Sequence, residues 1–232
     1  MTSTGWSAGS KPRAELEGVF TTDDLLDCYR EGVFPMADAR HDKKIFLVDP
    51  TRRGVLPLDS LKISRRLART VRSDRFEVRV DSDFEGVIAA CAAPRPGRLE
   101  TWINGSIEWL CTRLNQNGFA HSIETWREGR MVGGLYGIAI GGAFFGESMF
   151  SIETDASKVA LVHLVSRLRF GGFSLLDAQF LTDHLTTLGA VEISRADYRD
   201  RLAEALKLTA DFGRMPIQTV GAAALHATSQ RS

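Results

Sequence analysis

The stretch from residue 132 to residue 184 constrains the fold more than any other part of this chain. It opens with two apolar, β-prone runs that Gly141 and Gly142 separate. Glycine readily adopts the positive φ that a two-residue hairpin turn requires. We therefore predict a β-hairpin at the centre of a sheet. The next run is apolar on nearly every side and predicts a buried central helix, and residues 174–180 predict a further buried strand.

Polar side chains interrupt the two strands of this stretch that we expect to be buried. Glu147 and Met149 are two positions apart and should share a face, and Asp177 and Gln179 should do the same in the later strand. A carboxylate in such a run is costly unless it is paired or hydrogen-bonded. Glu147 and Asp177 therefore need either a structural partner or a ligand, and we favour a ligand because displaced acids often mark sites.

Four motifs in this order, GGLYG, FFGESMF, DASKVAL and LLDAQFLTDHLTTLGA, resemble the bacterial leucyl/phenylalanyl-tRNA-protein transferases. The resemblance extends over about residues 21–206. That family moves an amino acid from a charged tRNA onto the N-terminus of a protein. The resemblance implies an α+β fold: an acetyltransferase-like (GNAT-like) mixed sheet flanked by helices, with a small N-terminal domain. The predicted order of elements, β-α-α-β-β-β-α-β-α, agrees with such a layered fold.

The length of 232 residues and the 44% hydrophobic composition suit a main domain with a small accessory one. We expect four parts: a flexible N-terminal tail (1–20), a small N-terminal domain (21–56), the catalytic domain (57–208) and a C-terminal tail (209–232). No apolar run approaches the roughly 18 residues of a membrane span, and the start has no apolar signal core. We therefore expect a cytoplasmic protein, a monomer, with no membrane partner.

The three cysteines and the charge balance limit the kinds of partner that we expect this protein to bind. Cys28, Cys91 and Cys111 show no C-x-x-C spacing, which argues against a disulfide framework and a zinc site, so we expect no metal and no cofactor. Lysine plus arginine equals aspartate plus glutamate, at 29 each, so a polyanion must be held by a local patch.

Residues 61–73 predict a helix that could provide such a patch. Ile63, Leu67 and Val71 form its apolar stripe, and five cations lie opposite without interspersed acids. A solvated face is the ordinary interpretation of a charge run, but a phosphate-binding surface fits this one better. We expect tRNA phosphates to bind Lys62, Arg65, Arg66, Arg69 and Arg72.

The resemblance also implies contacts to the terminal adenosine of the tRNA. Met36 follows the GVFP turn, where the family often has tryptophan, and Trp102 belongs to a TWI motif. Cys111 stands where tyrosine is usual in the family. From spacing alone, Trp102 would more often be a core aromatic.

The reaction that the resemblance implies is aminolysis of an aminoacyl-tRNA ester (Leu, Phe or Met) by the α-amine of a protein that begins with Arg or Lys, which marks that protein for N-degron degradation. The reference pKa of such an amine, roughly 7.7–8.0, makes a modest base sufficient. Asp177, acting through or beside Gln179, is our candidate to orient the amine and accept its proton. Glu147 could take the same part or meet the acceptor's cationic side chain, and Thr182 is expected on the acceptor side.

The donor side chain should enter an apolar pocket. Strict alternation puts Phe144 and Met149 on opposite faces of their strand, so both can line one pocket only if a bulge, expected at Gly146, shifts the strand. By the resemblance, the pocket is formed by Leu135, Phe144, Met149, Leu161, Leu164, Leu168 and Leu176.

Other chemistries fit the residues less well. An acyltransferase of the same fold that uses coenzyme A would need a glycine-rich pyrophosphate loop, whereas SIETDASKVAL has no glycine. A serine hydrolase would need G-x-S-x-G, but Phe150 replaces the second glycine after Ser148. A non-catalytic tRNA-binding module remains the alternative from another class, since it explains the cationic helix but neither acid.

Overall fold

The computed structural model describes residues 13–15, 20–95 and 99–229 of the chain. A small N-terminal unit contains an antiparallel three-stranded sheet of order β1-β3-β2 and the helix α1. Thr21 caps this helix in a capping box with Asp24. The elements are α1 (Thr22–Arg30), β1 (Arg13–Glu15), β2 (Phe34–Met36) and β3 (Phe46–Val48).

The main domain is built on a seven-stranded mixed sheet of order β10-β4-β9-β8-β7-β6-β5. Among its described strands, the β8–β9 pair alone is parallel. The predicted hairpin is present at the centre of this sheet, and Gly141 turns it with φ +56°. The strands are β4 (Arg52–Val55), β5 (Glu77–Val80), β6 (Ala120–Arg127), β7 (Arg130–Ile140), β8 (Ala143–Ser151), β9 (Leu175–Gln179) and β10 (Val191–Ser194).

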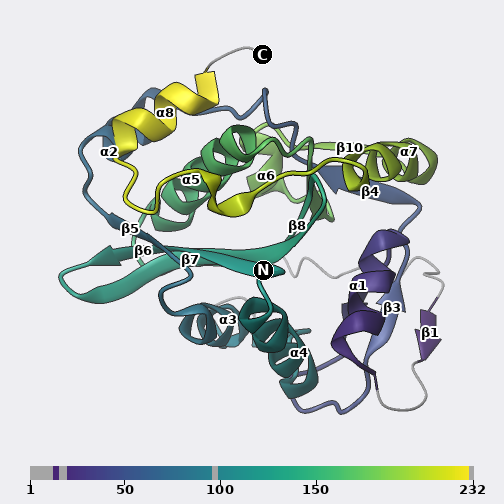
Figure 1. Cartoon of the computed structure of the whole chain (residues 1–232). Helices are drawn as coiled ribbons and strands as arrows, with labels where there is room; N and C mark the ends of the chain where they lie inside the picture. Colours follow the sequence, from purple (N-terminus) through teal and green to yellow (C-terminus); the bar gives the residue numbers. More distant parts are fainter. Residues whose placement is uncertain (1–12, 16–19, 96–98, 230–232) are drawn as a thin grey trace.

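Helices cover both faces of the sheet (Figure 1). The central helix α5, with α2 and α8, lies on one face, and α3 and α4 lie on the other. The fold class is therefore confirmed as α+β with a mixed, helix-flanked sheet, consistent with an acetyltransferase-like fold. The helices are α2 (Arg65–Arg72), α3 (Phe84–Ala92), α4 (Gly105–Gln116), α5 (Ala156–Gly171), α6 (Asp183–Thr187), α7 (Arg195–Leu206), α8 (Gly221–Ser229) and the short 3₁₀ helix η1 (Phe212–Arg214).

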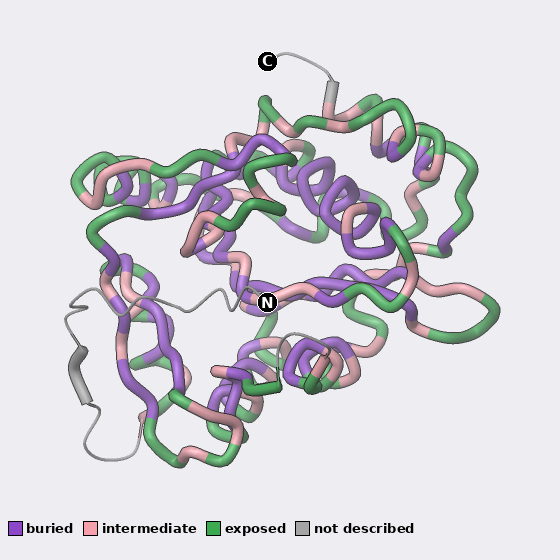
Figure 2. The backbone as a smooth tube through the Cα atoms, turned by 180° about the vertical axis from the view of Figure 1, so that it is seen from behind, coloured by how far each residue is buried: buried purple, intermediate pink, exposed green. Residues whose placement is uncertain are grey.

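The core is divided by the sheet into two main clusters. One joins the N-terminal unit, α3, α4 and α7 to the face that carries Tyr136 and Phe145, and the other joins α5 to the face that carries Leu135 and Phe144. As predicted, α5 is buried on nearly every side, which Figure 2 shows as a continuous buried tube. No helix in the described ranges is both long and apolar enough to cross a membrane.

Strand alternation changes phase once within β8. Gly137 pairs with Gly146 while Tyr136 pairs with Ser148, so Glu147 is the extra residue of a β-bulge. The bulge expected at Gly146 is thus present one residue later. It brings Met149 into the same cluster as Phe144, and it makes the prediction that Glu147 and Met149 share a face wrong.

Two of the predicted domain limits are wrong. β4 belongs to the large sheet, between β10 and β9, so the N-terminal domain ends before β4 and not at residue 56. Most of the tail predicted over residues 1–20 lies outside the described residues, but Arg13–Glu15 within it pairs with β3.

The expected C-terminal tail (209–232) is also wrong, since its described part is ordered against α5. The ring of Phe212 stacks on His121 and on Phe144, with centroids 4.1 and 5.6 Å apart. Arg167 of α5 donates hydrogen bonds to the carbonyl oxygens of Phe212 and Met215, at 3.0 and 2.6 Å. The segment itself shows no strong periodicity. Its packing depends on the ring of Phe212 and on Arg167 of α5, and the sequence pattern did not indicate either contact.

Candidate active site

The candidate site is an opening between β8 and β9. The two strands pair only as far as Phe145 and Asp177, after which β9 continues along β4 and β8 follows β7. A cavity of about 230 Å³ lies where they part. It is lined by β8 beyond the bulge, by β9, by α5 and by the segment that leads into α6. Substrate groups on the two faces of the sheet could meet through this opening.

The α5 side of the opening is apolar. Phe144 and Leu168, both predicted as pocket residues, do not line the cavity and lie behind its wall in the same fully buried cluster. Leu56 and Leu185 line it as well, although the sequence did not single them out. The predicted residues that do line it are Leu135, Met149, Leu161, Leu164 and Leu176.

On the opposite face, Asp177 is held by Arg53 of β4. Arg53 Nε and Nη2 donate to Asp177 Oδ1 and Oδ2 at 2.9 and 2.6 Å, and neither side chain is more than 1% exposed. The hydroxyl of Tyr198 donates to Oδ2 at 2.8 Å, and the backbone N–H of Gln179 donates to Oδ1 at 2.8 Å. Both carboxylate oxygens are therefore fully occupied, as a buried charge requires.

Arg53 is itself enclosed. Its Nη1 donates to the carbonyl oxygen of Gly32 at 3.0 Å, and its guanidinium lies over the rings of Phe34 and Tyr198 at 4.5 and 4.4 Å. Burial lowers the pKa of Arg53, but the Asp177 carboxylate more than offsets this, so Arg53 stays charged. The preference for a ligand over a structural partner is therefore wrong for Asp177.

Glu147, the bulged residue, is held differently. Its Oε1 accepts hydrogen bonds from the Tyr29 hydroxyl at 2.8 Å and from Gln179 Nε2 at 2.7 Å. Its Oε2 is buried and has no hydrogen-bond partner among the residues that the structure describes. Burial raises the pKa of Glu147 to about 8, with a further increase from the Asp177 charge, although the bond from Tyr29 acts against it. Glu147 is thus mostly protonated at neutral pH.

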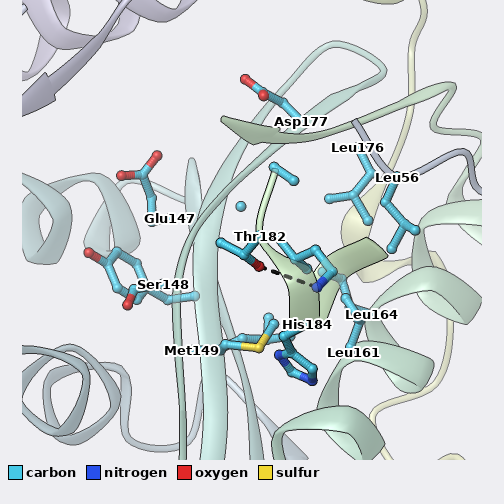
Figure 3. A pocket seen from close by; sticks show the side chains of 15 residues that line it. Leu56, Glu147, Ser148, Met149, Leu161, Leu164, Leu176, Asp177, Thr182 and His184 are labelled. Atoms are coloured by element: carbon cyan, nitrogen blue, oxygen red, sulfur yellow. Dashed lines mark hydrogen bonds between the residues drawn. The ribbon is translucent and has the colours of Figure 1, made fainter. Parts of the chain in front are cut away.

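Gln179 connects the two acids. Its backbone N–H binds Asp177 and its side-chain amide binds Glu147. Its φ of +60° is a left-handed conformation that non-glycine residues rarely adopt. As predicted, Asp177 and Gln179 lie on one face of β9. In Figure 3 the carboxylates of Asp177 and Glu147 point away from the leucine side chains.

The three residues expected to contact adenosine lie on the same side of the sheet as Glu147. Met36 and Cys111 are buried in that cluster, and Trp102 is partly buried against it. The Trp102 carbonyl oxygen accepts a hydrogen bond from Ala37 N at 3.1 Å, which joins the TWI segment to the strand that ends at Met36. Burial and the nearby Glu147 raise the pKa of Cys111 well above its ordinary value, so its thiol is neutral.

The cationic face on α2 is only partly as expected. Ser64 caps the helix, so Lys62 precedes it instead of lying on it. Arg66 pairs with Asp155 at 3.0 Å. Three other arginines of α2 form no ion pair with any residue in the ranges 13–15, 20–95 and 99–229. These three are Arg65, Arg69 and Arg72, all exposed.

The rim of the cavity is formed by the residues that begin α6. Thr182 caps this helix by accepting a hydrogen bond from Leu185 N at 3.2 Å, drawn as the dashed line in Figure 3. Ser148, which the sequence suggested only for a discarded hydrolase, and His184 also line the cavity. Burial and the charge of Lys158 lower the pKa of His184.

The start of α5 does not resemble a pyrophosphate loop. Asp155 directly precedes this helix at the N-cap position, has φ +69° and makes no side-chain cap, and its carboxylate pairs with Arg66 and Lys158. An acid here disfavours the anion that such a helix N-terminus otherwise binds. Among the described residues, no three His, Cys, Asp or Glu side chains gather as metal ligands do.

The sequence of this chain is similar to those of one family of known proteins. A model described as leucyl/phenylalanyl-tRNA protein transferase matches residues 55–203, and one for the N-terminal domain of the same proteins matches residues 18–51. Proteins named leucyl/phenylalanyl-tRNA–protein transferase are similar along most of their length. The relative from Caulobacter vibrioides is 59% identical over 94% of this chain and 100% of its own. The relative from Phenylobacterium zucineum is 62% identical over 83% of this chain and 87% of its own length. The relative from Maricaulis maris is 56% identical over 92% of this chain and 99% of its own length.

Proposed function

Because this chain belongs to the leucyl/phenylalanyl-tRNA–protein transferase family and is an aminoacyltransferase, we propose that it moves Leu, Phe or Met from aminoacyl-tRNA to the α-amine of proteins that begin with Arg or Lys. The observation that carries this proposal is the opening between β8 and β9, which has an apolar wall on one face of the sheet and hydrogen-bonding groups on the other. Such products enter N-degron degradation, and the supply of charged tRNA places the reaction in the cytoplasm.

The donor side chain binds in the apolar part of the cavity. Leu161 and Leu164 of α5 face Leu135 and Met149 across it, and Leu176 of β9 closes one side. Phe144 and Leu168 support this wall from behind. A pocket without charged groups at the side-chain end favours Leu, Phe and Met over polar donors.

The tRNA binds on the other side of the opening and along α2. The terminal adenosine packs at the region of Met36, Trp102 and Cys111, and the cations on and before α2 that have no ion pair among the described residues bind phosphates farther along the acceptor arm. Met36 packs against the base without a polar contact, and the fully buried Cys111 contributes through the residues that cover it. Phosphate binding rests on Lys62, Arg65, Arg69 and Arg72, with Arg66 shared with Asp155.

The acceptor enters past Thr182 at the rim. Its amine attacks in the neutral form, and holding amine and ester carbonyl in register supplies much of the acceleration, since an ester is already activated. Asp177 contributes as a positioning residue: both its oxygens are occupied, and it fixes Gln179 and Arg53. Gln179 and Glu147 are the groups with atoms left to meet the substrate.

The transfer assay uses purified protein, leucyl- or phenylalanyl-tRNA and a peptide that begins with Arg. We expect leucyl- or phenylalanyl-peptide, and no product from acetyl-coenzyme A. Binding of charged tRNA without turnover would instead support a non-catalytic module. Leu161→Trp fills the pocket and should suppress Phe transfer more than Leu transfer. Equal losses for both donors would place the donor side chain elsewhere.

A further inference from the structure

Two buried polar atoms, each on a residue that lines the cavity, have no hydrogen-bond partner among the described residues. Tyr136 Oη and Glu147 Oε2 make no hydrogen bond to any residue that the structure describes, and both residues line the cavity. Buried polar atoms are nearly always hydrogen-bonded, and leaving one unsatisfied is costly. Two such atoms from neighbouring strands at one cavity indicate a place for a polar group of the substrate. The third unpartnered atom, Thr125 Oγ1, belongs to a residue that does not line the cavity.

The hydrogen bonds of Glu147 determine which oxygen carries its proton. Oε1 already accepts from Tyr29 and from Gln179, so a proton on the carboxyl group must sit on Oε2. Burial raises the pKa of Tyr136 well above its ordinary value, so its hydroxyl also keeps its proton. The two unpartnered atoms are therefore both hydrogen-bond donors.

Two hydrogen-bond donors at one place can assist a step of aminolysis that positioning alone does not assist, the departure of the leaving group. As the amine nitrogen bonds to the ester carbon, the bond from that carbon to the ribose oxygen must break. A ribose alkoxide is a poor leaving group, and a proton delivered to it in the transition state lowers the barrier. The proposed adenosine residues Met36, Trp102 and Cys111 lie in the cluster on this same face.

We propose that Glu147 Oε2 donates a proton to the leaving ribose oxygen and that the Tyr136 hydroxyl donates a hydrogen bond to the same oxygen. The proposal rests on the aminoacyl transfer proposed above. The step balances: the C–N bond forms, the C–O bond breaks and the oxygen leaves as a hydroxyl. The proton that the amine nitrogen releases returns to Oε2, so Glu147 ends the cycle protonated.

The test varies the leaving group and the two donors together. Single-turnover transfer to the peptide is measured with leucyl-tRNA whose terminal ribose is native or is 2′-fluoro-2′-deoxyribose. The fluorine makes the ester oxygen a better leaving group that needs less protonation. Each donor is used with the wild-type protein, Tyr136→Phe, Glu147→Gln and the control Thr125→Val, which removes the remaining unpartnered hydroxyl without touching the cavity.

With the native donor, we expect Glu147→Gln to lose roughly 10²-fold and Tyr136→Phe roughly 10-fold in rate, and Thr125→Val to match the wild type. With the fluorinated donor, both losses relative to wild type should shrink several-fold. Thermal melting should show Tyr136→Phe as stable as the wild type, since its hydroxyl has no partner to lose among the residues that the structure describes.

Losses that are the same for both donors would overturn the proposal and assign the two residues to binding. An unchanged rate for Tyr136→Phe would also overturn it. Failure of the proposed function looks different, because the wild-type protein would then not transfer leucine from the native donor at all.

Discussion

Asp177 and Glu147 lie at the same opening in the sheet but are held in opposite ways. Arg53, Tyr198 and Gln179 occupy every side of the Asp177 carboxylate, whereas Glu147 has one oxygen with two donors and one with none among the described residues. A buried carboxylate beside an opposite charge is held rigidly by that pair, whereas burial without such a pair favours the protonated form, as the raised pKa of Glu147 shows. The fully bonded acid therefore supports the site, and the half-bonded one is available for chemistry.

The largest expected effect is on the stability of the Asp177 cluster. Asp177→Asn leaves the Arg53 guanidinium buried without its counter-charge, which should lower the free energy of unfolding by about 3–5 kcal/mol. Urea unfolding and single-turnover transfer on one preparation measure both consequences. The double variant Arg53→Met with Asp177→Leu should regain part of the lost stability because no charge remains buried. A stable Asp177→Asn protein that has lost transfer would instead make Asp177 the base.

The second expected effect is on the pH dependence of folding stability, to which Glu147 contributes. Its folded pKa of about 8 lies above its ordinary value of 4.5, so between these pH values the folded protein holds a proton that the unfolded chain has lost. Stability from this group therefore falls as pH rises through that window, by at most about 1.4 kcal/mol per pH unit. Urea midpoints between about pH 5 and pH 8 should fall less steeply for Glu147→Gln than for wild type. Parallel curves would contradict the protonated state.

Gln179 allows a finer test because it touches both acids. Gln179→Met keeps the backbone N–H that binds Asp177 and removes the side-chain bond to Glu147 Oε1. Stability should fall by about 1 kcal/mol, the usual cost of one hydrogen bond. The pKa of Glu147 should rise, since that bond lowers it, and the pH window of the preceding experiment should extend upward. A loss as large as that of Asp177→Asn would mean that the two clusters act as one.

The smallest effect extends the comparison of paired and unpaired charges to the surface. Arg66 pairs with Asp155, whereas Arg69 on the same helix has no ion pair within the described ranges. Folding stability should change by less than about 1 kcal/mol for either alanine variant. The slope of tRNA affinity against salt should decrease by about one for Arg69→Ala and by less for Arg66→Ala. Equal slopes for the wild type and Arg69→Ala would make this face merely solvated.

The sequence predicts those features of the fold that depend on local pattern. The hairpin, the buried helix α5 and the shared face of Asp177 and Gln179 follow from periodicity and glycine placement. The mixed sheet with its flanking helices is implied by the family resemblance and is confirmed. The bulge was expected from the conflict between Phe144 and Met149, although its position was off by one residue.

What the sequence missed depends on contacts between distant residues. Arg53 lies 124 positions from Asp177, and nothing in the RRGV run distinguishes it from the neighbouring Arg52 or identifies its partner. The same limit applies to the C-terminal segment, whose order comes from Arg167 and Phe212 instead of its own pattern. The unpartnered oxygen of Glu147 likewise depends on where Tyr29 and Gln179 come to lie.

The packing of the C-terminal segment on α5 has a consequence for biosynthesis. α5 supplies Leu161 and Leu164 to the donor wall, and its outer side is covered by η1 and α8, which are the last described elements of this sequence. During translation these residues leave the ribosome after everything else shown here. Because a domain generally folds as a unit, we expect the donor pocket to gain its outer support only after α8 has emerged.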